Sequence, residues 1–160
     1  MILLFNKIPF KPVDKQIKMD LLIKLREYHS LYDSYYKVLI PTAGLGKRLK
    51  DHTKYINKSL ISINYKPAIA YIIEYYPPKT EFVIALGYKG DLVKNFLKLA
   101  YPNKKFYFVK INKYSGKKSG LGYTILCCKK YLKNPFIFHA CDTLIQGKIP
   151  DPKFNWMGFS

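Results

Sequence analysis

Acidic residues are scarce in this chain of 160 residues, which has 10 Asp and Glu against 28 Lys and Arg and a formal net charge of +18. This excess favours anionic partners such as nucleotides, nucleic acids or acidic surfaces, without choosing among them. The lysines are spread along the whole chain, which favours a solvated lysine surface. Because neither a zinc-finger spacing nor a basic-region heptad pattern is present, a nucleic-acid binder is disfavoured.

Cysteine is also scarce, and Cys127, Cys128 and Cys141 form no C-x-x-C pair. Neither a structural zinc site nor a disulfide framework is indicated, and reduced thiols fit best. No apolar run approaches the length of a membrane span, and the apolar residues at 1–5 are too few for the core of a signal peptide. We therefore expect a cytoplasmic protein with one sizeable core.

The first 36 residues differ from those that follow. Apolar side chains recur with helical spacing over 14–36, with lysines between them. This pattern predicts a helical extension over 1–36, followed by a nucleotide-binding domain over 37–160. The helix would pack on the chain's own core, and binding to a partner is the alternative.

From Lys37 onward, strand-like and helix-like segments alternate. The expected strands are 38–42, 59–63, 82–86, 105–111 and 136–140, and the expected helices are 67–76, 91–99 and 120–132. This order predicts an α/β fold with a Rossmann-like, mostly parallel sheet, right-handed crossovers and helices on both faces. Ligands of such open sheets bind at the carboxyl ends of the strands, where Gly44, Gly87 and Asp142 would fall.

A glycine-rich turn with two cations, AGLGKR at 43–48, follows the first expected strand. The turn lacks the third glycine of a dinucleotide fingerprint and the longer loop of a Walker motif, so an ordinary strand-to-helix turn is the alternative. Lys58 stands just before the next strand-like run. The intervening chain can return its ammonium to a polyphosphate that the glycine turn would cradle. Arg48 would offer a planar charged fork and Lys58 a compact charge, although each could be a surface cation.

Asp142 directly follows an apolar run, where an unpaired carboxylate would be costly to bury. It could face a cleft, cap the next turn or bind a cation. Mg²⁺ prefers a few carboxylates together with phosphate oxygens, which suits a site that faces the glycine turn. Gly120 and Gly122 would let backbone pass close to a flat ring or sugar, or simply form a loop-to-helix turn. His139 fits a core histidine.

These motifs, taken in order, resemble the sugar-phosphate nucleotidyltransferase family (NDP-sugar pyrophosphorylase type), whose signature is A-G-x-G-x-R-L followed by P-K-x-L. The matching segments are AGLGKRL at 43–49, NKSL at 57–60, KP at 66–67, GY at 87–88, GLG at 120–122 and CDT at 141–143. The resemblance covers 37 to about 145, which corresponds to the nucleotide-binding half only, and implies a truncated version of that fold.

The resemblance also implies roles for these residues. Arg48 and Lys58 would be catalytic and hold the triphosphate of an NTP, and Asp142 would bind Mg²⁺. The residues implied in nucleotide binding are Ala43, Gly44, Leu45, Gly46, Lys47, Gly87, Gly120 and Gly122. A sugar-1-phosphate, or another phosphomonoester such as phosphocholine, would attack the α-phosphorus and expel pyrophosphate, in the synthesis of polysaccharide precursors.

Three departures from the family pattern stand out. Asn57 replaces the proline before Lys58, which we expect to loosen the loop. Cys141 replaces the glycine before Asp142. Nothing after Asp142 offers a convincing second carboxylate, since Asp151 lies in a Pro-Asp-Pro turn, so the chain looks incomplete at its C-terminus.

Alternative functions therefore stay open. The chain could be a non-catalytic nucleotide-binding or regulatory module derived from this family, acting with a partner subunit or as an oligomer. It could equally be part of a phosphocholine-type cytidylyltransferase. A GT-A glycosyltransferase shares the sheet, but it usually needs Asp-x-Asp, whereas Asp142 is followed by Thr143 and Leu144.

Overall fold

The computed structural model describes residues 19–20, 36–147, 149–150, 155 and 157–158. The chain divides into two units, Met1–Tyr32 and Asp33–Ser160, and the second carries the sheet. The helix expected over 14–36 lies outside the described residues, except for Met19 and Asp20, which are helical, and Tyr36. A helical extension over 1–36 before a domain over 37–160 thus stays a prediction.

Four strands form one parallel sheet in the order β5-β4-β1-β6. The strands are β1 (Lys37–Pro41), β4 (Glu81–Leu86), β5 (Phe106–Lys110) and β6 (Phe136–Phe138). In the register, Leu39 of β1 lies opposite Val83 of β4 and Phe138 of β6. The central strands β1 and β4 read as continuous apolar runs because helices cover both of their faces. The predicted parallel sheet is confirmed.

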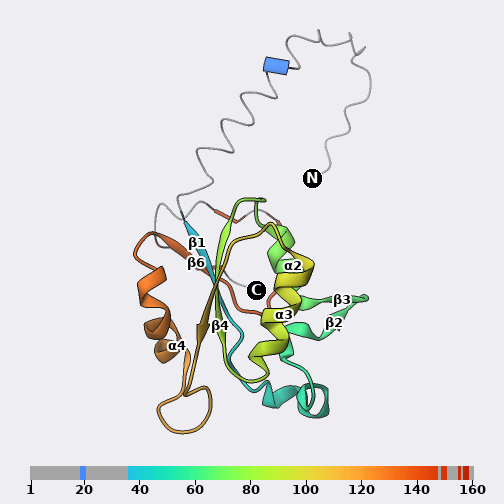
Figure 1. Ribbon diagram of the computed structural model, residues 1–160, viewed down its shortest axis with the longest axis vertical. Helices are drawn as coiled ribbons and strands as arrows, with labels where there is room; N and C mark the ends of the chain where they lie inside the picture. Colours follow the sequence, from blue (N-terminus) through green and yellow to red (C-terminus); the bar gives the residue numbers. More distant parts are fainter. Residues whose placement is uncertain (1–18, 21–35, 148, 151–154, 156, 159–160) are drawn as a thin grey trace. The chain divides into compact units, whose positions relative to one another are not determined.

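Helices α2 (Ala68–Tyr75) and α3 (Gly90–Ala100) cover one face of the sheet, and α4 (Leu121–Cys128) covers the other (Figure 1). One core lies under α2 and α3 and contains Ile73, Phe82 and Leu97. The second core lies under α4 and contains Val83 and Cys128. The 3-10 helix η3 (Lys129–Tyr131) directly follows α4. The two cores confirm the predicted Rossmann-like arrangement with helices on both faces.

The prediction of a strand over 59–63 was wrong. The chain instead forms the 3-10 helices η1 (Lys47–Thr53) and η2 (Lys58–Leu60), and then a separate antiparallel hairpin of β2 (Ser62–Ile63) and β3 (Lys66–Pro67). Asn57 caps η2 by accepting a hydrogen bond from the Ser59 amide, which favours a turn over a strand. Asn64 and Tyr65 have φ of 47° and 65°, the left-handed geometry of a tight hairpin turn.

The other expected elements differ from the observed ones by a few residues at their ends. The helix expected from Pro67 begins at Ala68, with Pro67 as its N-cap residue. In the part of the chain that the structure describes, no helix has both the length and the apolar character needed to cross a bilayer.

Candidate functional site

The parallel sheet brings Lys58 and Asp142 into contact, although 84 residues separate them in the chain. The Lys58 Nζ donates to Asp142 Oδ2 at 3.0 Å. Lys58 begins η2, and Asp142 lies in the turn that follows β6. The Lys58 side chain is 22% exposed and that of Asp142 is 55% exposed, so solvent and ligands can reach the pair.

The environment of Lys58 keeps its side chain charged. Burial alone would lower the pKa of the ammonium, but the neighbouring Cys141 and Asp142 offset burial, and the net pKa is raised. Burial raises the pKa of the Cys141 thiol to about 11. At neutral pH the site therefore presents an ammonium beside a neutral thiol.

The glycine turn after β1 packs against Lys58. Gly46 has a φ of 67°, and a Cβ at this position would lie 2.8 Å from Thr53 Cγ2 and 3.2 Å from Lys58 Cβ. Glycine is thus required both for the left-handed backbone and for the space. The Thr53 hydroxyl also donates to the Gly46 carbonyl at 3.3 Å. The turn and Lys58 lie side by side.

The turn after β4 lies directly on the turn after β1. A Cβ at Gly87 would lie 2.6 Å from the Ala43 carbonyl oxygen, and the Tyr88 amide donates to that same oxygen at 3.0 Å. The Tyr88 hydroxyl lies 3.0 Å from the carbonyl oxygens of Thr53 and Lys54. Gly87 therefore allows close packing of two turns.

Asn57 joins three of these segments and does not loosen the loop, so that expectation was wrong. Its Nδ2 donates to the Thr42 carbonyl at 2.8 Å and to the Tyr88 carbonyl at 2.6 Å. Its Oδ1 accepts from the Ser59 amide at 3.0 Å and from the Ser59 hydroxyl at 2.8 Å. The side chain is completely buried. Its four hydrogen bonds link the starts of the turns after β1 and β4 to η2.

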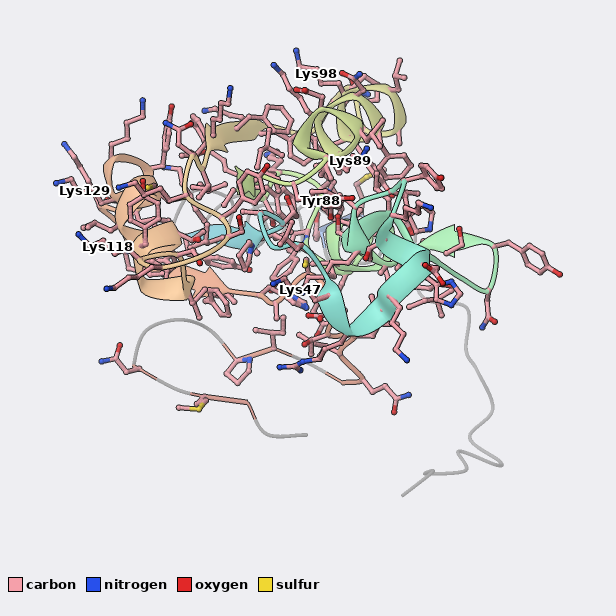
Figure 2. The ribbon with its side chains drawn as sticks, turned by 90° about the horizontal axis from the view of Figure 1, so that it is seen from below. Lys47, Tyr88, Lys89, Lys98, Lys118 and Lys129 are labelled. Carbon is pink, nitrogen blue, oxygen red and sulfur yellow. The ribbon has the colours of Figure 1, made fainter. Side chains whose placement is uncertain are left out.

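A cavity of about 230 Å³ lies between the glycine turn and the loop that follows β5. Its lining residues are Leu45, Gly46, Lys47, Tyr114, Ser115, Gly116 and Ser119. Figure 2 views this end of the sheet and labels Lys47 and Tyr88 there. Sequence reasoning assigned no role to 112–119, which lies between an expected strand and an expected helix. The available signal in this segment was an aromatic side chain, Tyr114, among lysines, serines and one glycine.

The predicted glycines of α4 lie elsewhere. Gly122 lines a second cavity, of about 290 Å³, together with Ile125, Leu126, Lys129, Leu132 and Phe136. A Cβ at Gly120 or Gly122 would meet nothing within 4 Å. These two glycines therefore face open space, and neither lines the cavity beside Lys47.

Other described cations lie exposed on separate elements. Arg48 is exposed on η1, and no hydrogen bond or ion pair among the described residues joins it to Lys58 or Asp142. Figure 2 shows Lys118 and Lys129 beside α4, and Lys98 on α3. The positive charge of the described residues is thus spread over several elements, and Lys58 is the cation that pairs with Asp142.

His139 holds the turn that carries Asp142. The ring is buried, and its Nε2 lies 2.9 Å from the Thr143 carbonyl oxygen, which can only accept a hydrogen bond. Nε2 therefore carries the proton, and Nδ1 accepts from the Tyr76 hydroxyl at 2.9 Å. Burial lowers the pKa of the imidazole, which favours this neutral form. The expected core histidine thus also shapes the candidate site.

Proteins with related sequences are nucleotidyltransferases. A D-glycero-alpha-D-manno-heptose 1-phosphate guanylyltransferase of Campylobacter jejuni is 32% identical over 123 residues, with 74% of this chain and 53% of that protein covered. A choline-phosphate cytidylyltransferase of Streptococcus pneumoniae is 30% identical, with 69% of this chain and 46% of that protein covered. This chain is related to the sugar-phosphate nucleotidyltransferases. It spans about half the length of these curated relatives, and no family model matches it.

The fold of this chain agrees with its relationship to the nucleotidyltransferases. A solved structure of CTP:phosphocholine cytidylyltransferase from Streptococcus pneumoniae superposes with a TM-score of 0.57 and 24% identity, covering 76% of this chain and 51% of the other. The predicted resemblance and the predicted fold are both confirmed. At 24% identity, the similarity to that solved structure shows a shared fold and nothing more.

The residues at the site can contribute to, but not complete, a magnesium site. Among the described residues, no group of three His, Cys, Asp or Glu side chains is arranged to hold a metal. Asp142 nevertheless supplies one exposed carboxylate beside Lys58, which packs against the glycine turn. Because Mg²⁺ commonly takes one or two carboxylates and fills its remaining positions with phosphate oxygens and water, this single ligand fits a metal that arrives with a nucleotide.

Proposed function

We propose that this chain is the nucleotide-binding portion of a nucleotidyltransferase. The reaction would transfer NMP from an NTP to a sugar-1-phosphate, or to a phosphomonoester such as phosphocholine, and would serve the synthesis of polysaccharide precursors. The observation that carries the proposal is the 3.0 Å contact of Lys58 with Asp142 at the carboxyl ends of a parallel sheet. The names of the relatives support this reaction class, with a guanylyltransferase for a heptose 1-phosphate and a cytidylyltransferase for choline phosphate.

In this proposal Lys58 and the glycine turn bind the phosphates together. Lys58 brings a compact charge next to Gly46, whose turn offers backbone N–H groups to an anion. Arg48 supplies a second, exposed cation on η1 that can approach the triphosphate from solvent. The cavity of about 230 Å³ beside Lys47 is the candidate place for the nucleoside part.

The reaction would be an in-line displacement at the α-phosphorus. A phosphate oxygen of the acceptor forms the new P–O bond, the bond from the α-phosphorus to the bridging oxygen breaks, and pyrophosphate leaves with that oxygen. Such a transfer needs little covalent help from a protein. Lys58 would stabilise the charge that develops on the α-phosphate oxygens, and the turn would hold the triphosphate in line.

Asp142 is the residue that would hold Mg²⁺, which neutralises phosphate charge when it is bound. Without a ligand, Asp142 is the counterion of Lys58. Binding of a magnesium nucleotide would then exchange partners, since Lys58 would turn to phosphate while Asp142 becomes a metal ligand. A cytoplasmic location, where NTPs are available, fits this function.

Isothermal titration of the full chain with ATP, GTP, CTP and UTP, each with and without Mg²⁺, tests the proposal. We expect one of the four to bind, and to bind more tightly with Mg²⁺. Asp142→Asn should remove the effect of Mg²⁺ and retain part of the binding, because the amide no longer attracts the cation. A folded protein that binds none of the four nucleotides would defeat the proposal.

A second candidate is a nucleotide-binding module without catalysis, which would act through a partner subunit or an oligomer. One observation favours it: among the described residues, Asp142 is the one carboxylate that forms an ion pair with Lys58. Release of pyrophosphate from the bound NTP with a panel of sugar-1-phosphates and phosphocholine separates the two candidates. Turnover establishes the enzyme, whereas binding without turnover favours the module.

A further inference from the structure

The carboxamide of Asn57 has a fixed orientation. The oxygens of Thr42 and Tyr88 are backbone carbonyls, which only accept hydrogen bonds, so the group that faces them must be the NH₂ group. Its oxygen faces the amide and hydroxyl of Ser59. All four contacts are 3.0 Å or shorter. No other uncharged arrangement of this buried side chain satisfies all of its partners.

The backbone at Asn57 does not itself require asparagine. Its φ is −70° and its ψ is 144°, values that proline also adopts. The family signature that this chain resembles has proline at this position. The difference between the two residues is therefore the carboxamide, which joins the Thr42 and Tyr88 carbonyls to η2 and which proline lacks.

These contacts set the position of Lys58 relative to the glycine turn. Asn57 directly precedes Lys58 in the chain, and its Oδ1 holds Ser59, the residue that directly follows it. Its Nδ2 holds Thr42, two residues before Gly44, where the turn begins. The affinity for an anion that binds to both the turn and Lys58 depends on the distance between the turn and Lys58. The two ends of the Asn57 carboxamide hold this distance.

We propose that Asn57 is a positioning residue that places Lys58 against the glycine turn and so determines the affinity for nucleotide phosphates. This inference rests on the proposed function, because it concerns the anion that Lys58 and the turn would share. Asn57 acts through Lys58 and does not touch the ligand.

Two substitutions test the role of the carboxamide. Asn57→Ala removes the amide, and Asn57→Pro also removes it while retaining the observed backbone angles. In isothermal titration with the magnesium nucleotide that the wild type binds, we expect each variant to bind about tenfold more weakly. Val93→Ala is the matched control, because Val93 is a fully buried residue of α3 and lies outside the site. This control should lower the melting temperature and leave the affinity unchanged.

A double-mutant cycle with Lys58→Ala separates positioning from general destabilisation. If Asn57 acts through Lys58, Asn57→Pro should cost almost no further affinity once Lys58 is absent. An additive loss in the double variant would overturn the inference, as would normal affinity in both single variants. A wild-type protein that binds no NTP would overturn the proposed function and this inference together, which distinguishes that failure from the other two.

Discussion

The turns around Asn57 and the start of α4 use glycine for opposite reasons. Around Asn57, buried hydrogen bonds join the turns, and Gly87 leaves no room for a Cβ. At α4, a Cβ on Gly120 or Gly122 would meet nothing, and Leu126 is 60% exposed. The first region is closely packed and held by buried hydrogen bonds, whereas the second presents an open apolar surface. Similar glycine motifs in a sequence therefore need not mark similar sites.

The largest effect should come from filling the tightest contact. In Gly87→Ala the new methyl group would lie 2.6 Å from the Ala43 carbonyl oxygen, and neither backbone segment can move without displacing its strand. We expect the free energy of unfolding to fall by about 3 kcal/mol. Urea unfolding followed by circular dichroism measures the change. An unchanged midpoint would mean that the two turns can separate, and the contrast between the regions would then be lost.

Removal of the Lys58 charge should affect binding more than stability. We expect Lys58→Met to weaken nucleotide binding roughly thirtyfold, about 2 kcal/mol, because a charged hydrogen bond to phosphate is lost. Stability should change little, since the carboxylate left behind is 55% exposed. Lys98→Met on α3 is the matched control. Equal losses of affinity in both variants would indicate that nucleotide is attracted by overall charge and not by a specific site.

The residues that could be predicted are those whose role follows from local pattern and strand order. Gly46 and Asp142 each follow an apolar run, and a parallel sheet places the carboxyl ends of its strands together. The edge of the sheet at which both lie was therefore foreseeable in outline, whereas the place of Lys58 did not follow from strand order, because the segment that it begins is a 3-10 helix. The sheet and its two helical layers followed from the alternation of segments in the same way.

The rest depended on contacts that no local pattern encodes. Asn57 bonds to carbonyls 15 and 31 residues away, so its stabilising role is invisible in a local window. The segment after Asn57 is rich in Ile and Ser and resembles a strand in sequence. The Asn57 side chain accepts a hydrogen bond from the Ser59 amide, and this cap makes the start of the segment a turn. The loop with Tyr114 has no periodicity, and only the packing of β5 beside β4 brings it near Lys47.

Low pH should lower the stability of the fold through His139, which holds the turn that carries Asp142. Because burial lowers the pKa of His139 in the folded state below its ordinary value of 6.5, the unfolded chain binds the proton first as the pH falls. Stability should therefore be retained above about pH 6.5 and decline below it, by at most about 1.4 kcal/mol per pH unit for one proton.

Urea unfolding of the wild type and of His139→Gln across this range provides the measurement. Glutamine keeps a polar group beside the Thr143 carbonyl but does not titrate, so this part of the pH dependence should flatten. An identical pH profile in both proteins would show that the decline comes from other groups and that the turn of Asp142 does not depend on the neutral imidazole.

The smallest effect should come from Gly122→Ala, and its sign carries the information. Gly122 lies within α4, where a methyl group would meet nothing within 4 Å. Alanine is the better helix former, so we expect the free energy of unfolding to rise by about 0.5 kcal/mol, opposite in sign to Gly87→Ala. Nucleotide titration of the same variant gives a second result. Unchanged affinity would place Gly122 outside the nucleotide site, as the cavity that it lines suggests, whereas weaker binding would mean that a ligand passes close to α4 and that the open surface belongs to the site.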